Sequence, residues 1–251
     1  MSIPERIFIV PYRNREIHKN LFLKHMTNYL KDSNDWVIYF AHQCDKRPFN
    51  RGAMKNLGFL AMKQKYPHHY KDITFIFNDV DSYPRIDGMI PYTTTPGVVA
   101  HYYGTNFALG GMFAIKGKDF EKTGGFPNFW GWGMEDNLIY ERCLHAGLIV
   151  DRSCFYPMHD NRIVRLFDGF KRVYSQREVS LYKNEKPDSI NDIRNIKYNI
   201  QNEFINIHNF NTPEDWTIID FKQRDIREGT KLKVEKGFVR KNWSMGSIIK
   251  K

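Results

Sequence analysis

The sequence predicts an α/β fold in which a Rossmann-like sheet is flanked by helices. Short apolar runs rich in β-branched and aromatic residues predict buried strands at residues 6–10, 36–40 and 73–77. Helical patterns between these runs predict helices over about residues 16–31 and 49–66. Strands that alternate with helices favour a parallel sheet with right-handed crossovers.

The second half of the chain is less regular. Apolar runs predict strands at residues 97–102, 107–115 and 148–150. A helical pattern near residues 137–146 is followed by glycine, which is typical of a helix C-terminus. Residues 160–185 have no clear period, and we expect a mobile loop there.

The 251 residues fit one domain with an appendage, and we place the boundary between residues 1–221 and a basic tail at residues 222–251. The net charge is +10, and the tail, with 10 Lys/Arg and 3 Asp/Glu, carries +7 of it. A basic tail attracts nucleic acid, anionic lipid or acidic glycan, but it is more often a solvated terminus. Because the body is near neutral, we expect no nucleic-acid partner.

The composition is that of a globular protein, with 41% hydrophobic and 26% charged residues. No run reaches the roughly 18 apolar residues of a transmembrane helix, and residues 1–6 do not begin a secretory signal. Cys44, Cys143 and Cys154 cannot all pair and lack metal-binding spacing, which favours reduced thiols. We therefore expect a cytoplasmic or otherwise non-secretory protein without a membrane anchor.

Asp79-Val80-Asp81 follows the third predicted strand, where alternation would put both aspartates on one side of the chain. Two neighbouring carboxylates repel each other, so a cation between them is favourable, and hard oxygen ligands suit Mg²⁺ or Mn²⁺. A divalent ion at a strand end is a partner for a diphosphate. The alternative is a solvated turn, since Asp-x-Asp triplets are common.

Three arginines are expected at the same edge of the sheet as the aspartates, where the carboxyl ends of the strands meet. Arg13 and Arg15 lie in the loop after the first strand, and Arg51 opens the second predicted helix. Guanidinium groups match phosphate oxygens, and the N–H groups of a helix N-terminus also favour anions. Any one of them alone is more often a surface arginine.

The stretch over residues 129–137 combines two indoles, two glycines and two carboxylates. The indoles of Trp130 and Trp132 offer flat faces that suit stacking on a sugar ring. Glu135 and Asp136 lie at an expected helix start, where the helix dipole favours carboxylates. One of them can accept the proton of a sugar hydroxyl that lies within hydrogen-bond reach, and the other can hold a neighbouring hydroxyl. The alternative is a capped turn with two core tryptophans.

His159 follows the last clear strand. Imidazole is a common ligand of Mn²⁺-like and Zn²⁺-like ions. A lone histidine is more often an ordinary surface or core residue, so its role as a ligand depends on whether the chain folds back toward Asp81.

Taken together, these residues resemble the β-1,4-galactosyltransferase family, glycosyltransferase family 7. The resemblance covers about residues 6–160 and extends more faintly to about residue 205. Each piece is weak alone, but their order is specific. The matching pieces are Pro11-Tyr12-Arg13-Asn14-Arg15, Phe49-Asn50-Arg51, Phe77-Asn78-Asp79-Val80-Asp81, Gly110-Gly111, Gly125-Phe126-Pro127-Asn128, and Trp130-Gly131-Trp132-Gly133 with Glu135-Asp136.

The resemblance implies a GT-A fold with a mixed sheet, divided into a nucleotide-binding half over about residues 1–82 and an acceptor-binding, catalytic half over about residues 83–221. It implies a metal-dependent, inverting transfer of galactose or N-acetylgalactosamine from a UDP-sugar to a hydroxyl of a glycan or glycoconjugate, usually in β-1,4 linkage. Mn²⁺ would be the cofactor, with Mg²⁺ a weaker candidate. The missing luminal disulfides and anchor of the family favour a viral or microbial enzyme outside the secretory route.

By position, the resemblance makes Asp136 the catalytic base, and Asp81 and His159 the metal ligands. The acceptor would contact Trp132, Glu135 and Asp136. The donor would contact Pro11, Arg13, Arg15, Phe49, Arg51, Asp79, Val80, Asp81, Gly111, Trp132 and Gly133.

Several positions depart from the family pattern. A methionine that binds the metal in many members is replaced by Tyr156, and a histidine that serves in others by Pro157, so the third protein ligand stays open. Many members carry a tyrosine that restricts the 2-substituent of the donor sugar, where this chain has Ala108. We expect the smaller side chain to admit an N-acetyl group. Asn137 stands where the family often has Asp.

Two other functions stay open. One is a GT-A transferase with a different UDP-sugar or linkage. The other is a catalytically silent glycan-binding protein, against which the retention of Asp81, Glu135, Asp136 and His159 argues.

Overall fold

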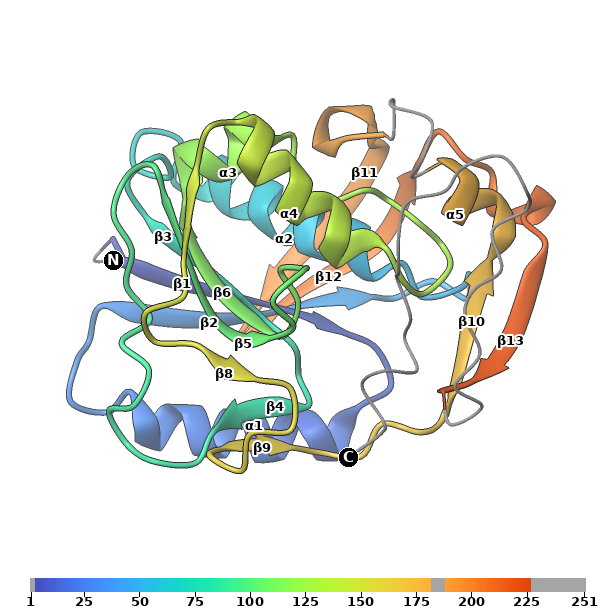
Figure 1. Cartoon of the computed structure of the whole chain (residues 1–251). Coiled ribbons are helices and arrows are strands. Elements are labelled where there is room, and N and C mark those ends of the chain that lie inside the picture. The colour runs from blue at the N-terminus through green and yellow to red at the C-terminus, as the bar shows by residue number, and fades with distance from the viewer. Residues whose placement is uncertain (1–2, 182–187, 227–251) are drawn as a thin grey trace.

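The computed structural model describes residues 3–181 and 188–226. Within them, nine strands form one mixed sheet (Figure 1). The strands are β1 (Arg6–Tyr12), β2 (Trp36–Gln43), β3 (Thr74–Asn78), β5 (Val98–Gly104), β6 (Met112–Lys116), β7 (Ile149–Asp151), β8 (Tyr156–Pro157), β11 (Arg194–Gln201) and β12 (Phe204–Asn211). Their order is β11-β12-β2-β1-β3-β6-β5-β7, with β8 paired to β5.

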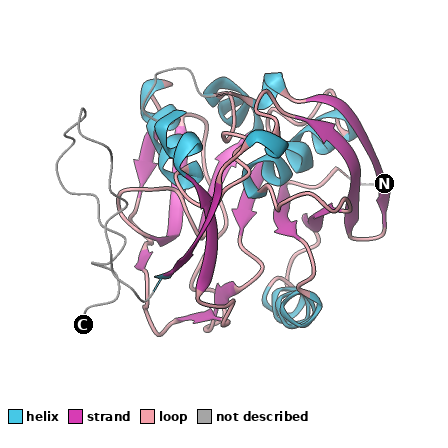
Figure 2. Cartoon of the chain, turned by 90° about the vertical axis from the view of Figure 1, so that its right-hand side faces the viewer, coloured by secondary structure: helices cyan, strands magenta, loops and turns pink. Residues whose placement is uncertain are grey.

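Helices cover both faces of the sheet. In Figure 1, α1 (Glu16–Tyr29) lies on one side, and α2 (Arg51–Lys65), α3 (Gly117–Thr123) and α4 (Glu135–His145) lie on the other. Figure 2 shows the same layers after a quarter turn, with a single helix seen nearly end-on below the strands. The α/β prediction, with a Rossmann-like mixed sheet flanked by helices, is therefore confirmed.

Strand β1 explains why an apolar run without alternation forms a strand. Ile7 and Ile9 belong to the core on the α2 side, whereas Phe8 and Val10 belong to the core on the α1 side. All four side chains are fully buried. Both faces of the strand are therefore covered, as is usual for parallel strands between helix layers.

The pairing of the strands brings four loops to one edge of the sheet. Strand β1 runs parallel to β2 and β3, so their carboxyl ends meet there. Strand β6 runs antiparallel to β3, and Asn78 at the end of β3 lies opposite Met112 at the start of β6. The Gly110-Gly111 pair therefore reaches the same edge as Asp79 and Asp81.

Two expected elements in the middle of the chain differ from the structure. The strand expected at residues 107–115 is wrong for residues 107–111, because Gly111 has a φ of 74° and the strand begins only at Met112. Helix α3 was not expected, since seven residues are too few to show a helical period. The helix expected from residue 137 begins two residues earlier, at Glu135.

The mobile loop expected at residues 160–185 is wrong for most of its length, while residues 182–187 lie outside the described residues. It contains β9 (Ile163–Arg165), β10 (Lys171–Ser175) and α5 (Gln176–Leu181). Strand β9 pairs with β4 (Ser82–Pro84), and β10 pairs with β13 (Phe221–Asp225). Such short strands show no local period, because the partners that define them are distant in sequence.

The remaining described elements are the 3₁₀ turns η1 (Ile190–Asp192) and η2 (Trp216–Ile218). Residues 222–225 of the expected tail complete β13, and residues 227–251 lie outside the described residues. Strands of both expected halves share one sheet, and the division near residue 82 stays a prediction. None of the helices in the described part of the chain is long and apolar enough to cross a membrane. Cys44, Cys143 and Cys154 are unpaired.

Candidate active site

Arg51 connects the strand-end aspartates with the Trp-Gly stretch. Its Nη2 donates to both carboxylate oxygens of Asp79 at 2.7 Å, and its Nη1 donates to Glu135 at 2.7 Å and to Asp136 at 3.0 Å. Burial lowers the pKa of Arg51, but the charges of Asp136, Asp79 and Glu135 more than offset it and hold that pKa well above its ordinary value. Three carboxylates from two distant parts of the sequence thus meet at one permanently charged guanidinium group.

Local chemistry fixes Arg51 at the first position of α2. The fully buried Asn50 caps the helix, because its side chain accepts the N–H of Ala53 at 2.9 Å. A Cβ on Gly52 would lie 2.1 Å from the carbonyl oxygen of Pro127, so only glycine lets the helix pack this closely. The start of α2, which follows the Phe49-Asn50-Arg51 segment, therefore packs directly against the Gly125–Asn128 segment.

The two aspartates lie in a turn, not on the strand. Strand β3 ends at Asn78, whose Nδ2 donates to the carbonyl oxygens of Asp79 at 2.8 Å and Ser82 at 2.9 Å. Arg51 and Lys55 overcome the effect of burial and lower the pKa of Asp79. The expectation that strand alternation aligns the carboxylates is therefore wrong in its reason, because a side-chain-stabilised turn orients them instead.

Asp81 is the least compensated carboxylate of the site. Within the described residues its side chain has no hydrogen bond or ion pair, although its carbonyl accepts the N–H of Leu166 at 2.7 Å. Burial first, and then the charges of Asp79 and Asp168, raise the pKa of Asp81 to about 7. A half-buried carboxylate without a side-chain hydrogen bond or ion pair is the kind of group that a cation stabilises.

Tyr103 interacts with both His159 and Asp81. Burial raises the pKa of the Tyr103 hydroxyl, the charge of Asp81 raises it further, and a hydrogen bond from the backbone of His159 lowers it. The Tyr103 hydroxyl also donates to Met158 Sδ at 3.3 Å. The hydroxyl of Tyr156 instead faces the carbonyl of Met89. Within the described residues, no three His, Cys, Asp or Glu side chains form a complete metal cluster.

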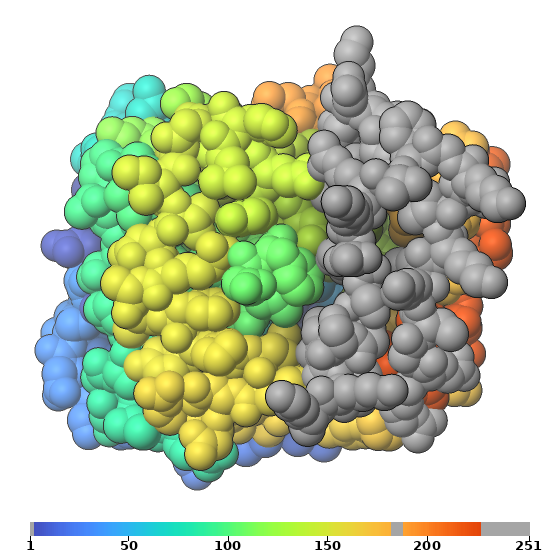
Figure 3. Space-filling model, viewed as in Figure 1, coloured from blue at the N-terminus to red at the C-terminus, as the bar shows by residue number. Residues whose placement is uncertain are grey.

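The Gly110-Gly111 pair touches both sides of the site. The carbonyl of Gly111 accepts the N–H of Asp79 at 3.1 Å, and the carbonyl of Asp136 accepts the N–H of Leu109 at 2.8 Å. A Cβ on Gly110 would lie 2.8 Å from Asp136 Oδ2, so glycine leaves room for that carboxylate. In Figure 3 the green loop between β5 and β6 lies at the centre of the visible face, beside the yellow-green surface of α4.

The two adjacent carboxylates differ in access. The side chain of Glu135 is 5% exposed, and its oxygens accept from Arg51 and from the N–H of Gly133 at 2.9 Å. The side chain of Asp136 is 24% exposed. Burial raises the pKa of Glu135. Glu135 therefore holds the Trp-Gly loop from within, while Asp136 faces the open side.

The two tryptophans also differ, so the sugar-stacking and core interpretations each hold for one of them. Trp130 is buried, stacks on Phe210 with ring centres 5.4 Å apart, and donates its indole N–H to Thr212 at 2.9 Å. Trp132 is only partly buried, and its backbone N–H donates to Val173 at 2.7 Å. Of the two indoles, Trp132 is therefore the more exposed, although the Arg172 guanidinium lies 5.7 Å from its ring centre.

The side chains of the loop after β1 do not all point toward the carboxylates. Pro11 is buried in β1, and the Arg13 guanidinium lies 5.2 Å from the ring centre of Phe49. Arg15 instead donates to the carbonyl of Asp168 at 3.0 Å. Val80 is buried between the two aspartates. Among the residues expected to contact the donor, only Arg51 pairs with the acidic residues Asp79, Glu135 and Asp136.

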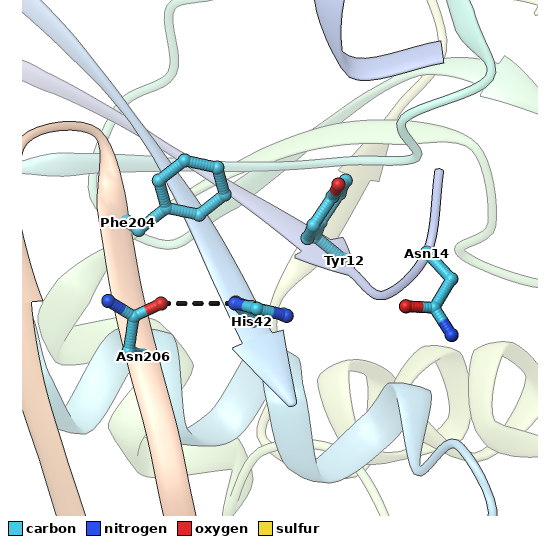
Figure 4. A pocket seen from close by; sticks show the side chains of 5 residues that line it. All are labelled: Tyr12, Asn14, His42, Phe204 and Asn206. Carbon is cyan, nitrogen blue, oxygen red and sulfur yellow. Dashed lines mark hydrogen bonds between the residues drawn. The ribbon is translucent and has the colours of Figure 1, made fainter. Parts of the chain in front are cut away.

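A separate pocket lies beside this loop, between the ends of β1 and β2 and the start of β12 (Figure 4). His42 and Asn206 interact across it at 3.0 Å. Its lining residues are Tyr12, Asn14, His42, Phe204 and Asn206. The sequence did not indicate this pocket, because β12 was not recognised as a neighbour of β2.

Sequence reasoning missed two charged residues in the site. Lys55 was assigned only to a helix, although a lysine one turn after Arg51 on the inner face is a detectable signal. Glu178 fell in the expected loop. It is 2% exposed, and its two oxygens accept the N–H groups of Trp130 at 2.5 Å and Gly131 at 2.6 Å. Glu178 therefore anchors the Trp-Gly stretch to α5.

Glu178 gives a pH-dependent prediction. Burial raises its pKa from about 4.5 to about 7, and the two N–H groups lower it only in part. The folded protein thus binds more protons than the unfolded chain between these pH values, so Glu178 makes stability fall as pH rises through that window. Glutamine does not titrate. From pH 5 to pH 8 the wild type should therefore lose free energy of unfolding relative to Glu178→Gln. Urea unfolding at both pH values measures it, and a constant difference would contradict the assignment.

The sheet, with its acidic edge, has the GT-A glycosyltransferase fold. A solved structure of Drosophila β-1,4-galactosyltransferase 7 matches it with a TM-score of 0.60 at 21% identity, over 82% of this chain and 94% of that one. Residues 3–93 match the model for the N-terminal region of glycosyl transferase group 7, and residues 98–165 match the model for the N-terminal domain of galactosyltransferase. The chain belongs to glycosyltransferase family 7.

Curated relatives agree with this assignment. Drosophila melanogaster β-1,4-galactosyltransferase 7 is 29% identical over 79% of this chain and 64% of its own length. Pig β-1,4-galactosyltransferase 5 and mouse β-1,4-galactosyltransferase 1 are 31% and 32% identical over 57% of this chain. The chain spans less than two thirds of these relatives, including only 39% and 38% of the latter two.

Proposed function

We propose that this protein is an inverting, Mn²⁺-dependent glycosyltransferase that moves galactose or N-acetylgalactosamine from a UDP-sugar to a glycan hydroxyl, usually in β-1,4 linkage. The observation that carries the proposal is the Arg51 network, which places the strand-end Asp79 and the helix-start Asp136 on one guanidinium group. A donor site and a catalytic base are thereby adjacent.

The acidic edge fits a divalent cation. Asp79, Asp81, Glu135 and Asp136 supply four carboxylates, whereas α2 supplies the cations Arg51 and Lys55. Asp81 would hold the ion together with His159, and the donor diphosphate would supply further oxygen ligands. A bound Mn²⁺ would act as a Lewis acid that stabilises the negative charge of the departing UDP. Mg²⁺ suits the same oxygens but has less affinity for imidazole.

The other roles follow from access and direction. Asp136 would accept the proton of the attacking hydroxyl, because its side chain is the more exposed of the two helix-start carboxylates. Glu135 and Trp132 would hold the acceptor, and Trp132 and Gly133 would cover the donor. Uridine and diphosphate would contact Pro11, Arg13, Arg15, Phe49, Arg51, Asp79, Val80, Asp81 and Gly111. Attack opposite the leaving UDP inverts the anomeric carbon.

The relatives support the substrate classes. One solved relative is described as a complex with manganese, UDP-Gal and xylobiose. The proposal extends those classes to this chain as a UDP-sugar donor and a glycan acceptor. A silent glycan-binding protein would have no need for a half-buried Asp81 without a side-chain ion pair beside the more accessible Asp136.

The proposal is tested by UDP release from UDP-Gal, UDP-GalNAc and UDP-glucose with Mn²⁺, with and without glycan acceptors that include xylobiose. We expect release that depends on acceptor and is abolished by a chelator. UDP binding without transfer to any acceptor in a broad glycan panel would favour the silent glycan-binding alternative.

The donor choice gives a separate prediction. Ala108 is 5% exposed and precedes Leu109, whose N–H binds the carbonyl of Asp136. We propose that its small side chain leaves room for a 2-N-acetyl group. Ala108→Tyr should lower the UDP-GalNAc to UDP-Gal ratio of kcat/KM by about tenfold or more, because the larger side chain would clash with the N-acetyl group. Strict rejection of UDP-GalNAc by the wild type would contradict it.

A further inference from the structure

Lys55 is a fully buried lysine beneath the acidic edge, with 1% of its side chain exposed. Lysine is almost never buried to this degree unless its charge is paired, because removing an ammonium group from water is costly. It lies one helical turn after Arg51 on α2, so both cations point to the same side of the helix. The Nζ atom lies 4.6 Å from the ring centre of Phe126.

The partners of Lys55 belong to both sides of the site. Its Nζ donates to Asp136 Oδ1 at 3.4 Å and lies 3.8 Å from Asp79 Oδ1. Arg51 reaches the same two carboxylates and also Glu135. Without Lys55, one guanidinium group would have to compensate three carboxylates.

We propose that Lys55 is a positioning residue that holds the Asp136 carboxylate toward the acceptor while Arg51 serves Asp79 and the donor. This inference rests on the proposed function, and it deepens the role of that site. Arg51 enters the site from the N-terminus of α2 and is the cation that an incoming diphosphate would contact. Lys55 is buried below Arg51. Its contact with Asp136 can therefore persist when donor binding changes the contacts of Arg51.

The packing around Asp136 explains why orientation matters. The carboxylate lies against Gly110, where a Cβ would be only 2.8 Å from Oδ2, and Lys55 binds the other oxygen, Oδ1. Gly110 thus lies beside one oxygen of the Asp136 carboxylate, and Lys55 lies beside the other. A base must lie within hydrogen-bond reach of the proton that it accepts, and small misplacements are costly in rate.

The test replaces Lys55 with methionine, which keeps the length of the side chain and its contact with Phe126 but removes the charge. We expect Lys55→Met to lower kcat for transfer by about tenfold or more, with the Kd for UDP within about threefold of wild type. Lys63→Met is the matched control, because Lys63 lies on the same helix and pairs with Glu121 far from the site. The control should keep the wild-type kcat.

Folding is checked by thermal unfolding, and Lys55→Gln, which retains a hydrogen-bond donor without the charge, replaces methionine if that variant is unstable. A kcat within twofold of wild type would overturn the role of Lys55. An equal loss of UDP affinity and kcat would overturn it as well, because Lys55 would then serve the donor or the fold. A wild type that binds UDP but transfers no sugar would instead overturn the proposed function, and with it the role of Lys55.

Discussion

Asp136→Asn is expected to lower kcat for sugar transfer by about 10²–10⁴-fold, the range that general-base catalysis contributes. Asparagine keeps the shape of the side chain, and its oxygen can still accept from Arg51 and Lys55, which both bind Asp136 in the structure. It cannot accept the proton of the acceptor hydroxyl. The loss should therefore fall on kcat, while the Kd for UDP stays within about twofold.

The measurement combines initial rates at saturating donor and acceptor with calorimetry of UDP binding. Glu141→Gln is the matched control, since Glu141 lies on the same helix, more than a turn beyond Asp136. Turnover of Asp136→Asn close to that of the control would refute the assignment of the base.

The neighbouring Glu135→Gln should behave differently, because both Glu135 oxygens accept hydrogen bonds from protein groups. We expect this variant to loosen the Trp-Gly loop and to raise the KM for the acceptor.

Asp81→Ala is expected to remove the activation by Mn²⁺ and lower transfer by about 100-fold or more. Lewis-acid stabilisation of a leaving group contributes several kcal/mol, and each 1.36 kcal/mol is a factor of ten in rate. Of the four carboxylates of the acidic edge, Asp81 is the one whose side chain has no hydrogen bond or ion pair within the described residues, so a cation is its natural counterion. Removing Asp79 would also disturb Arg51, whereas removing Asp81 tests the metal alone.

Activity is measured against Mn²⁺ concentration, and Mn²⁺ binding is measured by calorimetry with UDP present. Asp87→Ala, in the exposed turn after β4, is the control for the loss of one negative charge from a nearby stretch of the chain. A Mn²⁺ activation curve unchanged in Asp81→Ala would place the metal elsewhere.

The strand-end chemistry was predictable from sequence, because residue type and position along the chain carry it. Strands at β1, β2 and β3 were recognised from their apolar runs, and the carboxyl ends of parallel strands must share an edge. This rule alone predicts that Arg51 and the aspartates lie at that edge. Their specific pairing was not predictable, since Arg51 and Glu135 are 84 residues apart.

Elements defined by distant partners were missed for the same reason. Strand β12 joins β2, and β10 joins β13, but neither pair has a local signal beyond weak alternation. The sequence also left both tryptophans equivalent. Trp130 became a core residue only because β12 brings Phe210 under its ring.

By itself, the sequence determined the α/β class, the acidic edge and the candidate base, because periodicity and side-chain chemistry are local properties. Only the tertiary structure decided which carboxylate is accessible, which indole is exposed, and that Lys55 and Glu178 contact the residues of the site. Those outcomes depend on burial and on the distances between side chains from different elements, and long-range packing alone sets both.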